Sequence, residues 1–195
     1  MEWLVEIQDF MNKGGFVMPP LLLLTMLLWY GLGYRFWVLR RKRNHSVRQL
    51  IKQRDAHWNT KPRDIVERAL KDGYRVKLLA PSQLRKHLDV EFYPYEKEIR
   101  KHTALIKIVV VIAPLMGLLG TVTGMIETFD SLAEMALFTQ SGGIAGGISQ
   151  ALFTTQMGLA VAIPGVLLMS FLDRKQRRIQ SELEQIKDLL CMDRL

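Results

Sequence analysis

Three long apolar runs divide the chain, and a charged segment separates the first run from the second. A helix needs about 20 residues to cross the roughly 30 Å hydrocarbon core of a bilayer, and each run is long enough. The hydrophobic pattern therefore predicts three transmembrane helices, at residues 16–39, 105–129 and 148–172.

Small and polar residues recur at three- and four-residue spacing in the second and third runs, so they share one face of each helix. Such a face lets another backbone approach closely and offers hydroxyl groups along the contact. We therefore predict helix packing at these small residues, and kinks at the two prolines inside the runs. The predicted packing positions are Gly117, Gly120, Gly124, Gly158, Pro114 and Pro164, and the polar positions predicted to line a pathway are Thr121, Gln150, Thr154 and Thr155.

The charged residues are distributed unevenly around the three runs. Residues 40–107 contain 19 basic and 8 acidic residues, whereas residues 127–147 contain three acidic residues and no lysine or arginine. Basic residues favour the cytoplasmic side of a membrane, so the N-terminus is predicted outside and the C-terminus inside. A basic loop of this kind also accounts for the net charge of +8 without nucleic-acid binding.

The remaining segments complete an all-α membrane protein whose long helices extend into the cytoplasm. Residues 1–15 are predicted as an amphipathic lead on the periplasmic side, and residues 130–147 as a periplasmic loop. Residues 40–104 form a cytoplasmic helical domain, and residues 173–195 a cytoplasmic C-terminal helix. An apolar stripe on that last helix indicates packing on the loop helices or on a neighbouring subunit: Ile179, Leu183, Ile186, Leu189 and Leu190.

Within the cytoplasmic domain, turn signals predict short helices at residues 46–54, 62–72 and 82–88, with Gly73 closing the second. From Tyr95 onward no helix breaker precedes the second run, so one continuous helix is predicted to enter the membrane. The first run reads as a lipid-facing anchor with aromatic residues at its inner end, where Arg35 can reach the headgroups.

Neither polar run carries a carboxylate, a histidine or a lysine near its middle. Carboxylates inside the membrane mark proton relays, so a titrating group for proton transfer would have to come from a partner helix. Hydroxyls and amides can hold water or bind a carboxylate, but they do not titrate. The alternative is purely structural, because threonine in a spanning helix often bonds its own backbone and glycine serves close packing.

Signatures of soluble enzymes are absent from the sequence. Cys191 is the only cysteine, the four histidines show no ligand spacing, and no phosphate-binding loop or catalytic triad is recognisable. We therefore predict no catalytic residue, no metal and no cofactor.

The two polar runs carry long motifs, APLMGLLGTVTGMIETF at residues 113–129 and GGISQALFTTQMGLAVAIPG at residues 146–165. These resemble the signature spans of the MotA/TolQ/ExbB proton-channel family, most closely ExbB-like proteins. The resemblance is strong over residues 103–171, and topology agrees over nearly the whole chain. It implies a homopentamer in the inner membrane of a Gram-negative bacterium, enclosing two ExbD-like single-span subunits.

In that family, a membrane aspartate of the ExbD-like partner carries protons, and the motor drives a TonB-like transducer that opens outer-membrane receptors. The resemblance places pore-lining threonines at Thr121 and Thr155. Many relatives carry glutamate within a pattern like ISEAL, whereas this chain reads ISQAL, so the position is Gln150. Gln150 cannot bind a proton directly, which suggests a variant subfamily.

Two other functions remain open from the sequence. A TolQ-like motor would use the same spans for envelope integrity, and a non-conducting scaffold would use the glycine faces for assembly alone. A nucleic-acid-binding role for the basic loop is disfavoured by its membrane location and its interspersed acidic residues.

Overall fold

The computed structural model describes residues 10–11, 14–40, 47, 51, 62, 64–79, 83–135 and 142–192. These residues form a short 3-10 helix and five α-helices and contain no strand, which confirms the all-α prediction. Three stretches are long and apolar enough to cross a membrane, and they lie within Gly15–Val38, Leu84–Asp130 and Gly146–Met192. The prediction of three spans is therefore confirmed.

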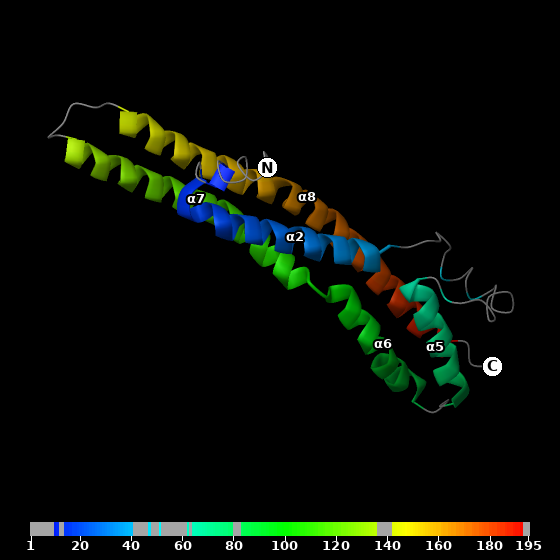
Figure 1. The fold of residues 1–195 in the computed structure, drawn as a ribbon. Helices are drawn as coiled ribbons and strands as arrows, with labels where there is room; N and C mark the ends of the chain where they lie inside the picture. The colour runs from blue at the N-terminus through cyan, green and yellow to red at the C-terminus, as the bar shows by residue number, and fades with distance from the viewer. Residues whose placement is uncertain are drawn as a thin grey trace, which may run out of the picture. The chain divides into compact units, whose positions relative to one another are not determined.

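The helices vary widely in length along the chain (Figure 1). A 3-10 turn, η1, precedes the first span, and the last helix alone comprises 51 residues. The predicted lead at residues 1–15 and the predicted helix at residues 46–54 fall mostly outside the described residues. The elements are η1 (Gly15–Val17), α2 (Met18–Val38), α5 (Ile65–Leu79), α6 (Leu84–Arg100), α7 (Thr103–Met135) and α8 (Gly142–Met192).

The chain divides into two compact units. The first comprises Met1–Leu32 and Thr103–Met169, and the second comprises Gly33–His102 and Ser170–Leu195. In the first unit, Met18 and Leu21 of α2 pack on Ala113 of α7 and Ala162 of α8, and all four side chains are buried. Lipid is as apolar as these side chains, so van der Waals packing rather than the hydrophobic effect holds this cluster together.

One face of α2 packs against the other two spans, which corrects the prediction of a purely lipid-facing anchor. A Cβ on Gly31 would lie 3.0 Å from Ile106 Cγ1 of α7, and one on Gly165 of α8 would lie 3.1 Å from a methyl group of Leu28. Leu21, Leu28 and Leu32 are buried, whereas the aromatic residues nearby are exposed. In the sequence, the spacing of Leu21, Leu28 and Leu32 and the small residue Gly31 indicated this packed face of α2.

In the second unit, α5 and α6 pack together and the C-terminal part of α8 completes an apolar core. Of the predicted stripe, Ile179, Leu183, Ile186 and Leu190 are buried and Leu189 is partly exposed, so the stripe packs within the chain rather than waiting for a neighbouring subunit. A Cβ on Gly73 would lie 2.7 Å from Leu190 Cδ1, so this glycine sits under a neighbouring side chain. The prediction that Gly73 ends its helix is wrong, because α5 continues to Leu79 and uses Gly73 for packing.

The continuous helix predicted from Tyr95 into the second run is also wrong. α6 ends at Arg100, Lys101 adopts an extended backbone with φ −57° and ψ 139°, and His102 has a positive φ of 61°. The ring of His102 packs edge-on against Tyr34, with centroids 4.8 Å apart, and the Lys101 ammonium lies 5.1 Å from the same ring centroid. These contacts with α2 replace the continuation of the helix, and propensity alone could not reveal them.

The sequence predicted that Arg35 reaches the headgroups, but in the structure its side chain is buried. Its side chain is 1% exposed, and Nη2 lies 3.1 Å from Asp173 Oδ1 and 2.5 Å from Gln176 Oε1. Among the described residues, its Nε and Nη1 have no hydrogen-bond partner. Arg35 is therefore a buried cation that ties α2 to α8 within the second unit.

Lys187 forms the centre of a second ion-pair cluster in that unit. Its ammonium lies 2.9 Å from Glu184, 3.0 Å from Asp89 and 3.1 Å from Glu96. Burial alone would lower the pKa of Lys187, but hydrogen bonds to these three carboxylates outweigh burial and raise it. A raised lysine pKa contributes stability below the ordinary lysine value, and this is lost only as the pH rises through the folded-state value. Lys187 therefore stays protonated across the neutral range.

We expect Lys187→Met to lower the free energy of unfolding by about 1–2 kcal/mol, because Glu96 would lose its ion pair and Arg85 alone would be left to balance Asp89 and Glu184. Thermal unfolding of the purified protein, with proteolysis of the second unit as the readout, measures the loss. Lys86→Met removes an exposed lysine of α6 and is the matched control. Equal unfolding temperatures for the two variants would contradict a stabilising role for Lys187.

Candidate functional site

The small residues of α7 and α8 lie where the two membrane helices approach most closely. A Cβ on Gly158 would lie 2.8 Å from the Ala113 carbonyl oxygen, and one on Gly117 would lie 3.1 Å from the Thr154 carbonyl oxygen. A Cβ on Gly124 would lie 3.1 Å from the Gly147 carbonyl oxygen. The two helices therefore meet backbone to backbone, as antiparallel neighbours in Figure 1.

Thr154 lies inside this contact. Its side chain is 1% exposed, its hydroxyl donates to the Ala151 carbonyl at 2.9 Å, and a Cβ on Gly120 would collide with it. Thr128 is buried in the same way near the end of α7 and donates to the Gly124 carbonyl at 2.7 Å. Pro114 and Pro164 lie in α7 and α8, which continue as helices through both prolines.

Thr155 and Thr121 occupy one edge of the contact. The Thr155 hydroxyl crosses between helices and donates to the Gly117 carbonyl at 3.1 Å. Thr121 follows Gly117 by one helical turn, so it lies on the same side, and its hydroxyl donates to the Leu118 carbonyl at 2.7 Å. Both side chains are partly exposed, so both hydroxyl groups lie at this edge of the helix contact.

Gln150 lies on the opposite edge, where η1 contacts it. A Cβ on Gly15 of η1 would collide with the Gln150 amide nitrogen. On this same edge, the Phe10 ring packs edge-on against Phe153, with centroids 5.5 Å apart. The structure thus brings Thr121 and Thr155 together and places Gln150 and Thr154 elsewhere. The contact between Gln150 and Gly15 has no signal in the sequence, since 135 residues separate the two positions.

The site contains no group that titrates near neutral pH in the middle of the membrane. Across residues 105–129 and 148–172, the ionisable side chains are Lys107 and Glu127, both near the ends of the second run. No group of three potential metal-ligating side chains was found among the described residues. The arrangement can solvate a proton or a carboxyl group, but it does not itself carry a proton.

Comparison with known proteins shows the family of the chain. The sequence model of the MotA/TolQ/ExbB proton channel family matches residues 57–185, which include both polar spans. A protein of Synechocystis sp. named as an ExbB-like biopolymer transport protein is 35% identical over 207 residues, which cover 93% of this chain and 79% of that protein. Biopolymer transport protein ExbB of Aquifex aeolicus is 43% identical over 82 residues, or 42% of this chain and 55% of that protein. With its three membrane-crossing helices and its matched polar spans, the chain belongs to the MotA/TolQ/ExbB proton channel family.

Proposed function

We propose that this chain is the proton-channel subunit of an ExbB–ExbD-type motor in the inner membrane of a Gram-negative bacterium. The motor uses the proton motive force to energise TonB-dependent import across the outer membrane. The N-terminus lies outside and the C-terminus inside in this proposal, as the charge distribution predicts.

The observation that carries the proposal is the pairing of two threonine hydroxyls on one edge of a hairpin without a central titrating group. Such an edge can solvate a carboxyl group but needs that group from elsewhere. The proposed donor is a membrane aspartate of an ExbD-like single-span subunit, enclosed by a homopentamer of this chain. Thr121 and Thr155 line the pathway, while Thr154 and Gln150 position the helices around it.

The test is proton flux in liposomes that contain the full-length chain and its single-span partner. Thr121→Val and Thr155→Val are each expected to lower the flux by about tenfold or more. Each variant removes a hydrogen bond to a charged group, and such a bond contributes about 1.5–3 kcal/mol. Growth on scarce iron should fail in the same variants, while the complex still assembles.

Thr123→Val is the matched control. Its hydroxyl donates to carbonyls of its own helix, Leu119 at 3.2 Å and Gly120 at 3.1 Å, and helical geometry places it on the other edge of the α7 stripe. Equal flux in all three variants would contradict a lined pathway. No flux from the unmodified complex would favour a scaffold, and detergent sensitivity with normal growth on scarce iron would favour a TolQ-like motor.

A further inference from the structure

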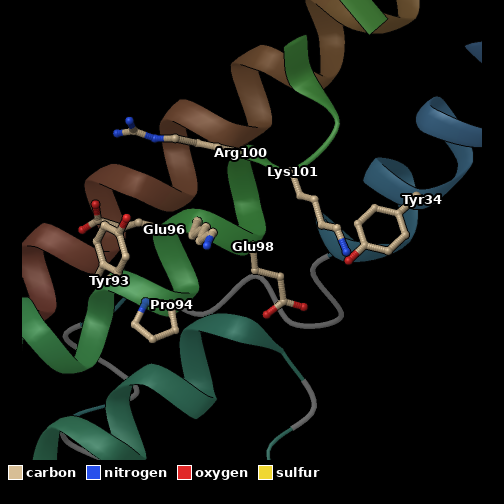
Figure 2. A pocket seen from close by; sticks show the side chains of 8 residues that line it. Tyr34, Tyr93, Pro94, Glu96, Glu98, Arg100 and Lys101 are labelled. Atoms are coloured by element: carbon tan, nitrogen blue, oxygen red, sulfur yellow. The ribbon is translucent and has the colours of Figure 1, made fainter. Parts of the chain in front are cut away.

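A groove of about 710 Å³ opens at the C-terminal end of α6, within the second unit. Figure 2 shows Tyr34 of α2 on one side of it and the last turns of α6 on the other. Charged and aromatic side chains make up most of its lining: Tyr34, Tyr93, Pro94, Glu96, Lys97, Glu98, Arg100 and Lys101.

The end of α6 shapes this groove. The extended backbone at Lys101 turns its side chain toward Tyr34, as Figure 2 shows, and the ammonium lies 5.1 Å from the ring centroid. His102 packs edge-on against the same ring, with centroids 4.8 Å apart. Tyr34 is thus held by two residues from the break that ends the helix, and the groove depends on that break.

Positive charge is in excess in the groove. Glu96 accepts a hydrogen bond from Lys187 at 3.1 Å, so part of its charge is already balanced. Lys97 and Arg100 are exposed, and neither forms an ion pair with another residue that the structure describes. With Lys101, the groove therefore has three cations, against the carboxylate of Glu98 and the partly balanced one of Glu96.

The groove lies beside the end of a membrane span. Tyr34 is one turn before Val38, where the apolar helix ends, and Phe36 and Trp37 nearby are 55% and 72% exposed. The Lys175 ammonium lies 5.3 Å from the Phe36 ring centroid and 4.6 Å from that of Phe171. Exposed aromatic rings beside lysines are typical of the headgroup level of a bilayer.

We propose that this groove binds the headgroup of an anionic phospholipid from the adjoining leaflet. The phosphate lies near Lys97 and Lys101, where the Tyr34 hydroxyl can donate to it. Glu98 lowers the net positive charge of the groove, and its carboxylate would repel the bound phosphate. The site does not depend on the proposed proton pathway.

Native mass spectrometry of the full-length protein tests this site. The protein is released from nanodiscs that contain equal amounts of phosphatidylglycerol and phosphatidylethanolamine, and the retained lipid is identified. Wild-type protein is expected to retain phosphatidylglycerol preferentially. The double variant Lys97→Gln/Lys101→Gln should retain about 25-fold less, since each lysine near an anionic headgroup contributes about fivefold.

The matched control is Lys71→Gln/Lys86→Gln, which removes two exposed lysines of the same unit outside the groove. An equal loss in both double variants, or no preference between the two lipids in the wild type, would overturn the proposal.

Glu98→Gln provides an independent readout should the double variant fail to fold. It is expected to raise retention of phosphatidylglycerol by about fivefold, and unchanged or lower retention would contradict the proposed site. Soluble glycerophosphoglycerol in excess should not displace the lipid. Complete displacement would mean that the groove binds a free phosphodiester rather than a membrane lipid.

Discussion

Replacing Gly158 with valine is expected to force α7 and α8 apart and to destabilise the membrane hairpin by about 3 kcal/mol or more. A Cβ at this position would lie 2.8 Å from the Ala113 carbonyl oxygen and 3.1 Å from the Gly117 Cα. Both obstacles are backbone atoms, so no side-chain rotation can relieve the clash and a whole helix must move. Reversible unfolding of the purified protein in micelles measures the loss.

Gly146→Val is the control for this experiment, because it is the same substitution in the same helix. No atom of a described neighbour lies within 4 Å of a Cβ placed there. The change in stability is therefore expected to reflect only the different helix propensities of glycine and valine. If the two valine variants unfolded alike, the backbone contact at Gly158 would not support the hairpin.

Replacing Asp173 with alanine is expected to cost about 3 kcal/mol, at the lower end of the range for breaking a buried ion pair. Arg35 is 1% exposed and Asp173 is 22% exposed. Without Asp173, the guanidinium would keep its hydrogen bond to Gln176 but no carboxylate to balance its charge, in a site that water scarcely reaches. The free energy of unfolding and the yield of folded protein both report the loss.

Two variants separate charge pairing from packing in that experiment. Arg35→Met/Asp173→Leu removes both charges and should recover most of the stability, because apolar residues of similar size often replace a buried pair at little cost. Asp188→Ala breaks a pair with Arg85 in which both side chains are about half exposed, and it should cost less than about 1 kcal/mol. Failure of the double variant to recover would show that Arg35 supports the fold by some means other than its charge pairing.

Sequence periodicity predicted the spans well because the signals are local. Twenty or so apolar residues specify a membrane helix, and small residues at three- and four-residue spacing specify its packed face. Gly117, Gly124 and Gly158 do lie where α7 and α8 approach most closely. The burial of Ile179, Leu183 and Ile186 followed from the same kind of pattern.

The features that the sequence did not predict depend on contacts between distant segments. Arg35 and Asp173 are 138 residues apart, and nothing local distinguishes this arginine from an ordinary residue at the end of a span. No glycine or proline marks the break after Arg100, and the residue that follows it, His102, packs against the ring of Tyr34. Local rules cannot supply such information, because the deciding partner lies elsewhere in the chain.

The hydrogen bonds of the two edge threonines bear on ion selectivity. A backbone carbonyl can only accept, so Thr155 donates its single hydroxyl proton to Gly117, and Thr121 donates its own to Leu118. Each hydroxyl can then only accept hydrogen bonds from an ion or group in the proposed pathway. An edge of this kind stabilises hydronium or a protonated carboxyl group and gives a chloride ion no donor, so a chloride gradient should leave the reversal potential of the proposed channel unchanged.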